Sequence, residues 1–232
     1  MQQLPLGVQL KERATFASFL TGDNAELIEH LQAVAVSGAG SVTWLAGSPA
    51  VGKSHLLQAV CSLAGSHGRA GYFPLAAIAA VTPEFIAGAG GLDCVCMDDL
   101  QVVAGDPAWE SALFGLYRQL ETRRAILVIA AEQLPGQLGL GLADLQSRLA
   151  AAANFVVQPL NEEQQLAALT LRAKLRGLEL PDETGRYLLR RLPRDMATLA
   201  ELLDTLDVAS LVAQRRLTIP FIRDVLEKTP QA

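Results

Sequence analysis

Residues 47–54 read GSPAVGKS and match the pattern G-x-x-x-x-G-K-[ST] at every fixed position. This pattern is typical of a phosphate-binding loop (P-loop). Its glycines let backbone N–H groups approach the phosphates, its lysine adds a cation, and its last hydroxyl reaches Mg²⁺. We therefore expect nucleotide contacts from the pattern and the residue after it: Gly47, Pro49, Ala50, Val51, Gly52, Lys53, Ser54 and His55.

The sequence around the loop supplies the strand–loop–helix context that the pattern requires. Residues 41–46 are a short apolar run, and residues 53–64 have apolar positions at helical spacing. Further strands are predicted over 70–75, 92–97, 125–131 and 154–158, with helices over 24–36 and 108–124 and a short one opening at Thr82 and Pro83. Because the strands are nearly continuous apolar runs, they predict an α/β domain whose parallel five-stranded sheet is flanked by helices.

The pattern changes after Pro159, where only helical signals follow. Asn161 and Gln164 have the spacing of a capping box, and Gly177 is the expected stop of that helix. Further helices are predicted over 181–192 and 195–214 and from Ile219 onward. The expected organisation is an N-terminal tail over 1–13, a nucleotide-binding domain over 14–159 and a small all-helical lid domain over 160–232.

Composition and charge exclude several classes of protein. The net charge is −5, which argues against DNA binding as the main role of the surface. Half of the 232 residues are hydrophobic, yet the longest charge-free run, between His30 and Lys53, contains the glycine-rich loop and does not read as a membrane span. With three cysteines and no secretory leader pattern, a cytoplasmic location is expected, with no membrane partner.

Residues 92–99 read LDCVCMDD, an apolar strand that ends in two acids. We expect this strand beside the strand that precedes the phosphate loop. Asp98 would then hold Mg²⁺ together with Ser54, and Asp99 would lie near the γ-phosphate as a catalytic acid. For Asp99, a helix cap or a solvated acid is the alternative.

For two arginines, the residues alone allow both a functional and a structural interpretation. Arg148 lies near the end of a predicted helix, just before the fifth strand. It suits an arginine finger, which reaches the nucleotide of a neighbouring subunit, and equally a surface arginine favoured by the helix dipole. Arg194 precedes the third helix of the lid, where it could contact the phosphates of a nucleotide. Arg190 and Arg191 compete for that role, and on the residues alone solvated arginines are the favoured interpretation.

With these parts in order, the chain resembles the DnaA/Hda family of AAA+ proteins over nearly its whole length. The stretches that carry the resemblance are FASF (16–19) with GDN (22–24), VAGD (103–106) with WE (109–110), LGLGL (138–142), DLQSRL (144–149) and AQRRLTIPF (213–221). The resemblance implies that Phe19 and Asn24 belong to the adenine-side segment of the nucleotide site. It also implies that Arg148 is the arginine finger and Arg194 the sensor 2 arginine of the lid.

The resemblance further implies a regulator of DNA replication that binds ADP or ATP with Mg²⁺ and forms a homodimer or a higher oligomer. Its partners would be the DNA polymerase sliding clamp and the ATP-bound initiator DnaA, whose ATP hydrolysis it would stimulate. Residues at the N-terminus resemble the family's clamp-docking motif: Gln2, Gln3, Leu4, Pro5 and Leu6. The family's glutamine falls on Met1, so Gln2 or Gln3 would replace it. Because the sequence stops soon after the lid, direct sequence-specific DNA binding is not expected.

The sensor 1 region departs from the family pattern, since residues 130–133 read AAEQ where more polar residues are usual. This departure predicts weak ATPase activity for the chain alone. The alternative is an autonomous AAA+ ATPase of the helicase-loader or clamp-loader type, which the intact pair of Asp98 and Asp99 favours.

Overall fold

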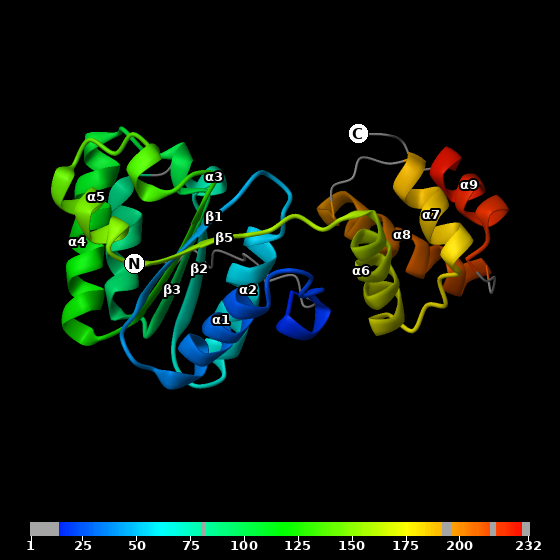
Figure 1. Ribbon diagram of the computed structural model, residues 1–232, viewed down its shortest axis with the longest axis horizontal. Coiled ribbons are helices and arrows are strands. Elements are labelled where there is room, and N and C mark those ends of the chain that lie inside the picture. The colour runs from blue at the N-terminus through cyan, green and yellow to red at the C-terminus, as the bar shows by residue number, and fades with distance from the viewer. Residues whose placement is uncertain (1–13, 80–81, 192–195, 214–216, 229–232) are drawn as a thin grey trace, which may run out of the picture. The chain divides into compact units, whose positions relative to one another are not determined.

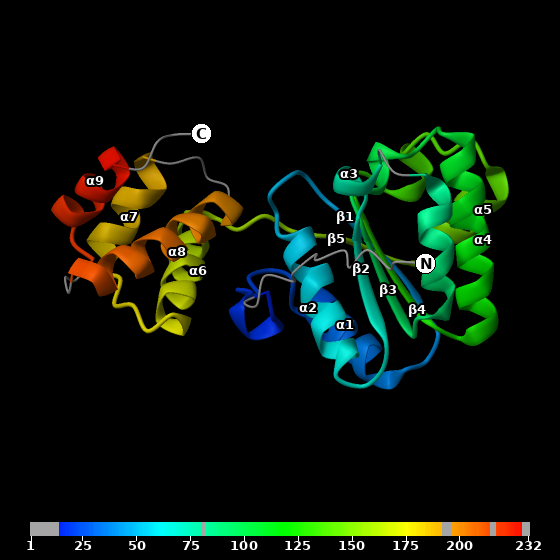
Figure 2. The same ribbon diagram turned by 180° about the vertical axis from the view of Figure 1, so that it is seen from behind.

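The structure of the chain is a computed structural model that describes residues 14–79, 82–191, 196–213 and 217–228. These residues form two compact units, one around a sheet and one of helices. The second unit begins at Pro159, and the short segments Leu20–Asp23 and Ala50–Gly52 are grouped with it. Figures 1 and 2 show each unit from two sides. In the described part of the chain, no helix has the length and apolar character needed to cross a membrane.

The sheet has five strands, and every pairing between them is parallel. Its order is β2-β3-β4-β1-β5. The strands are β1 (Val42–Ala46), β2 (Ala70–Pro74), β3 (Cys94–Asp98), β4 (Ile126–Ala131) and β5 (Ala153–Val156). β3 and β4 are buried along their whole length, as expected of inner strands covered on both faces. The predicted α/β fold with a parallel five-stranded sheet is confirmed.

Helices cover both faces of this sheet. In Figures 1 and 2, α1 and α2 lie on one face, and α4 and α5 lie on the other. The α-helices of the unit are α1 (Ala25–Ser37), α2 (Lys53–Gly65), α3 (Leu75–Ile78), α4 (Pro107–Arg123) and α5 (Ala143–Ala150). The unit also contains the 3₁₀ helices η1 (Phe16–Ser18), η2 (Pro83–Gly91), η3 (Leu100–Val102) and η4 (Pro135–Gln137). Side chains of β1, β3 and β4 pack against α4 and α5 in one core that contains Trp44, Met97 and Leu116.

The strand order corrects one prediction. β3, which carries the two acids, was expected beside β1, but β4 lies between them. Parallel strands end at the same edge of a sheet, so the intervening strand still leaves Asp98 within reach of α2, which packs across β2, β3 and β4.

The short helix predicted to open at Thr82 is confirmed at its start, where Thr82 is the N-cap and Pro83 the first helical residue. It forms a 3₁₀ helix, η2, and the Thr82 side chain makes no capping hydrogen bond there. Three glycines lie in this segment, Gly88, Gly90 and Gly91, and glycine disfavours the regular α-helix.

The helical unit contains α6 (Glu162–Leu175), α7 (Asp182–Arg191), α8 (Met196–Ala213) and α9 (Ile219–Lys228). The predicted capping box is confirmed: Asn161 Oδ1 accepts from the Gln164 backbone N–H, and Gln164 Oε1 accepts from the Asn161 backbone N–H, both at 2.9 Å. Gly177 follows α6 with φ +74, the left-handed backbone that ends a helix. Leucines from α6, α7 and α8 form the core of this unit together with Phe221.

Candidate functional site

The phosphate loop runs from β1 to the first turn of α2. Two of its residues have left-handed backbones, Ala50 with φ 64 and Gly52 with φ 101. Such a conformation turns successive backbone N–H groups toward one side, which is how a loop of this kind surrounds an anion. Pro49 and Ala50 are exposed, Val51 is half-buried, and α2 directs the positive end of its dipole to the loop.

The Lys53 side chain lies under this loop and is only 6% exposed. Its Nζ donates to the backbone oxygens of Gly47, at 2.6 Å, and Ser48, at 2.9 Å. Burial lowers the pKa of Lys53, whereas the negative charges of Asp98, Asp99 and Glu132 act to raise it. Within the described part of the chain, the hydrogen bonds of this buried ammonium group go to two neutral oxygens, which fits a site built for an anion such as the β/γ-phosphates of a nucleotide.

The side chain of Asp98 lies at the end of β3 and is buried. Its Oδ2 accepts from the Tyr72 hydroxyl at 2.7 Å, and its Oδ1 accepts from the Asp99 backbone N–H at 3.1 Å. Burial raises the pKa of Asp98, and a hydrogen bond from the Ser54 hydroxyl opposes this rise. The structure thus brings Ser54 and Asp98 together, and their oxygen atoms suit the hard Mg²⁺ ion that accompanies a nucleotide.

Asp99 has an unusual backbone. Its φ of 57 and ψ of 46 lie in the left-handed region, which few residues other than glycine adopt. Its Oδ1 accepts from Gln101 Nε2 at 3.1 Å. Asp99 occupies the N-cap position of η3, but its side chain makes no capping hydrogen bond there.

Residues on the predicted adenine side pack against α2. The ring of Phe19 lies 5.4 Å from the ring of His55, centre to centre. His55 Nε2 lies 2.9 Å from the backbone oxygen of Thr15 and 3.3 Å from Ser18 Oγ. His55 therefore ties the segment before Leu20 to the helix that follows the phosphate loop.

Asn24 is buried and uses its amide within the fold. Its Oδ1 accepts from the Gln158 backbone N–H at 2.7 Å, and its Nδ2 donates to the Gln158 backbone oxygen at 3.1 Å. These two bonds join the start of α1 to the chain after β5. Asn24 thus has a structural partner for both polar atoms, beside the nucleotide contact predicted for it.

Arg148 lies outside the cluster of Lys53, Ser54 and Asp98. Its Nη1 lies 2.9 and 3.0 Å from the two carboxylate oxygens of Glu121 on α4. Its guanidinium carbon lies 5.9 Å from the ring centre of Phe114 and 5.4 Å from that of Tyr117, both also on α4.

Several predicted residues lie outside the described part of the chain. They are Arg194, the predicted phosphate contact of the lid, and the docking residues Gln2, Gln3, Leu4, Pro5 and Leu6.

The structure adds residues that the sequence did not single out. Tyr72 reaches Asp98 from β2, and Gln58 of α2 hydrogen-bonds to Tyr72. Glu110 is buried and accepts from the backbone N–H groups of Gly105, Gly141 and Leu142 at 2.7, 3.0 and 2.6 Å. Glu110 was noticed in the sequence only as part of a family stretch, and no spacing rule predicts that it holds the loop before α5.

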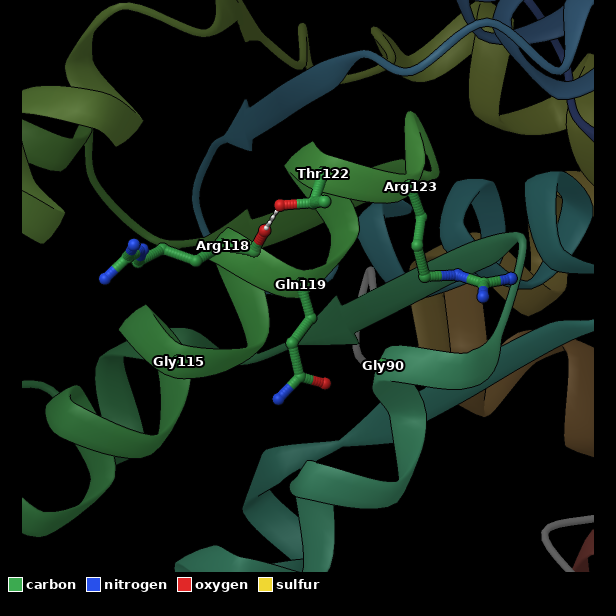
Figure 3. A pocket seen from close by; sticks show the side chains of 6 residues that line it. All are labelled: Gly90, Gly115, Arg118, Gln119, Thr122 and Arg123. Atoms are coloured by element: carbon green, nitrogen blue, oxygen red, sulfur yellow. Dashed lines mark hydrogen bonds between the residues drawn. The ribbon is translucent and has the colours of Figure 1, made fainter.

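A depression of about 510 Å³ lies between α4 and η2, apart from the phosphate loop (Figure 3). It is lined by Gly90, Gly115, Arg118, Gln119, Thr122 and Arg123. Figure 3 shows the side chains of Arg118 and Arg123 pointing in opposite directions, and Arg123 Nη2 lies 3.4 Å from Asp93 Oδ1. The two cations do not converge, so this surface does not form an anion site.

Comparisons with known proteins bear on the lid and on the fold. Residues 162–226 match the family described as "Hda, lid domain". Domain III of the replication initiation protein DnaA from Thermotoga maritima has the same fold, with a TM-score of 0.75 and 18% identity over 94% of this chain and 97% of that one.

Two further solved structures share the fold. AMPPCP-bound DnaA from Aquifex aeolicus is 19% identical to this chain, with a TM-score of 0.69. The match covers 95% of this chain and 71% of that DnaA chain. The Holliday junction branch migration motor RuvB from Thermotoga maritima is 17% identical to this chain, with a TM-score of 0.62. The match covers 88% of this chain and 67% of that RuvB chain.

Proposed function

We propose that this chain is an adaptor that negatively regulates replication initiation, because its lid matches the Hda lid family and its fold is that of DnaA domain III. It binds ADP or ATP with Mg²⁺ in its own phosphate loop. Residues near 2–6 dock on the DNA-loaded sliding clamp, and the AAA+ unit contacts ATP-bound DnaA. Arg148 then stabilises charge on the phosphoryl group that is transferred in the initiator, which is left in its ADP form.

The placement of Arg148 carries this proposal. In the described part of the chain its side-chain hydrogen bonds and ring contacts are with α4, and none is with the residues around Lys53. Its side chain is 39% exposed, so the guanidinium group is accessible to a second protein. A cation that is accessible and separate from the chain's own nucleotide site is suited to act on the nucleotide of a neighbouring subunit.

The first experiment compares Arg148→Ala with the parent in a mixture of initiator, ATP, clamp and DNA. An arginine supplied in trans is worth about 10³ to 10⁵ in rate, so this variant should lose nearly all stimulation of ATP hydrolysis while it still binds the clamp. Arg118→Ala is the matched control, because it removes the same charge from an exposed arginine of α4. Stimulation by Arg148→Ala at the parent rate would exclude the mechanism.

A second experiment tests the clamp contact. Short docking motifs bind when their apolar side chains fill a groove, so the double variant Leu4→Ala with Leu6→Ala should no longer be retained by immobilised clamp. Its affinity for nucleotide should not change. Retention equal to that of the parent would move the docking site to another part of the chain.

An autonomous ATPase is the second candidate. The gathering of Lys53, Ser54, Asp98 and Asp99 favours it, because these residue types suit hydrolysis of the chain's own nucleotide. Turnover of ATP by the purified chain separates the two functions. The adaptor should be slow alone and act only with clamp, DNA and initiator, whereas a motor should be fast alone.

A further inference from the structure

The face of α4 under Arg148 carries three residues at helical spacing, Phe114, Tyr117 and Glu121. Tyr117 is buried and Phe114 half-buried, so the aromatic part of this face is held by the core. Arg148 reaches it from α5, with its guanidinium carbon near both rings and its Nη1 on the Glu121 carboxylate. Carboxylate and rings together restrict where the guanidinium group can point.

In the residues that the structure describes, Arg148 forms its side-chain hydrogen bonds through Nη1. A guanidinium group has five N–H donors, and both bonds to Glu121 come from Nη1. The edge formed by Nε and Nη2 has two parallel N–H groups and can bind two oxygens of a phosphate side by side. Within the described part of the chain, Glu121 therefore occupies Nη1 and leaves the Nε–Nη2 edge available to a phosphate.

We propose that Glu121, assisted by the rings of Phe114 and Tyr117, is a positioning residue that presents the Nε–Nη2 edge of Arg148 to the triphosphate of a nucleotide bound by a neighbouring AAA+ subunit. This inference rests on the proposed function, in which Arg148 acts in trans. The orientation of the Arg148 guanidinium group matters for the rate of hydrolysis, because catalytic groups lose much of their effect when they are displaced by about 1 Å.

The ion pair of Glu121 and Arg148 is exposed on both sides, so it contributes little to folding stability. Its expected effect is on orientation. A long arginine side chain has many rotamers, and a contact that restricts them before the subunits meet spares part of the ordering cost in the transition state.

The test measures stimulated ATP hydrolysis as the concentration of the full-length chain is varied against initiator, clamp and DNA. Glu121→Gln keeps the size of the side chain and removes its charge. The maximal rate should fall about fivefold, which is about 1 kcal/mol, the upper range for an exposed pair. The half-saturating concentration and the thermal unfolding midpoint should not change, because neither subunit contact nor folding is altered.

Phe114→Leu is the second variant, since it keeps the apolar contact and removes the ring, and it should lower the maximal rate in the same way. The control is Glu29→Gln, an exposed glutamate on α1 for which the described residues provide no ion pair, and it should behave like the parent. In the background of Arg148→Ala, Glu121→Gln should have no further effect.

The outcomes separate the two claims. If Arg148→Ala keeps full stimulation, the proposed function fails. If Arg148→Ala is inactive but Glu121→Gln retains the parent rate or exceeds it, only the positioning role of Glu121 fails. An effect of Glu121→Gln that persists without Arg148 would also overturn that role.

Discussion

The hydroxyl of Tyr72 donates a 2.7 Å hydrogen bond to Oδ2 of Asp98 and so joins edge strand β2 to the acid at the end of β3. Burial and the charge of Asp98 both raise the pKa of Tyr72, so its hydroxyl remains a proton donor at every ordinary pH. The Asp98 carboxylate is thereby held among donors, although burial disfavours its ionised form.

The first prediction concerns the free-energy cost of burying the charge of Asp98. The pKa of Asp98 is raised, so the folded state binds its proton more tightly than the unfolded state does. Its contribution to stability therefore decreases as pH rises from about 3.9 through the higher folded pKa. At pH 7, Asp98→Asn should increase the free energy of unfolding of the nucleotide-free protein by about 1 kcal/mol.

Urea titration followed by tryptophan fluorescence measures this change, because both tryptophans of the chain, Trp44 and Trp109, lie in the sheet unit. Asp98→Asn should also lose the additional stabilisation that Mg²⁺ gives in the presence of ADP. Asp144→Asn, at an exposed position, is the control and should change neither quantity. A destabilised Asp98→Asn protein would contradict the assigned cost of the buried charge.

The second prediction is that Lys53→Met weakens the binding of nucleotide. The substitution removes the buried ammonium group and keeps most of its apolar stem. Charge-assisted contacts with phosphate are worth about 1.5–3 kcal/mol each, so affinity for a fluorescent ADP analogue should fall about a hundredfold. Lys174→Met, at an exposed position of the lid, should bind like the parent. An unchanged affinity would place the nucleotide elsewhere.

The third prediction concerns Glu110, whose carboxylate accepts three backbone N–H groups. Glu110→Ala leaves these donors without their partner in a buried place and should cost about 3–5 kcal/mol of unfolding free energy. Glu110→Gln keeps one acceptor oxygen and should cost less. Urea titration by tryptophan fluorescence measures both. Equal stability of Glu110→Ala and the parent would show that water or other groups replace the carboxylate.

His30 supplies the fourth prediction, because burial lowers its pKa, with only a partial opposing effect from Glu26. The folded state thus binds fewer protons at this site than the unfolded state. The contribution of His30 to stability should be fully present above about pH 6.5 and decrease as pH falls toward the lower folded pKa.

The difference in unfolding free energy between the parent and His30→Gln measures this effect. It should shrink or change sign between about pH 7 and pH 5, because only the parent carries the histidine. Glutamine retains a group able to bond with Thr43 Oγ1, which lies 2.9 Å from His30 Nε2. A difference independent of pH would show that the pKa of His30 is not lowered.

Much of the fold was predictable from local signals. The period of apolar residues and the capping residues act within one element, so they predicted the strands, the long helices and the Asn161 box without knowledge of the rest of the chain. The 3₁₀ form of η2 was missed, because a Thr-Pro start signals a helix but does not distinguish its type.

The sequence by itself determined the phosphate loop, since its residues are contiguous and their spacing carries the chemistry. Only the tertiary structure decided which distant side chains meet. Tyr72 and Asp98 are 26 positions apart, and Arg148 and Glu121 are 27 apart. These contacts depend on the order of the strands and on how α5 packs against α4, which are properties of the whole sheet unit and leave no periodic signal in the chain.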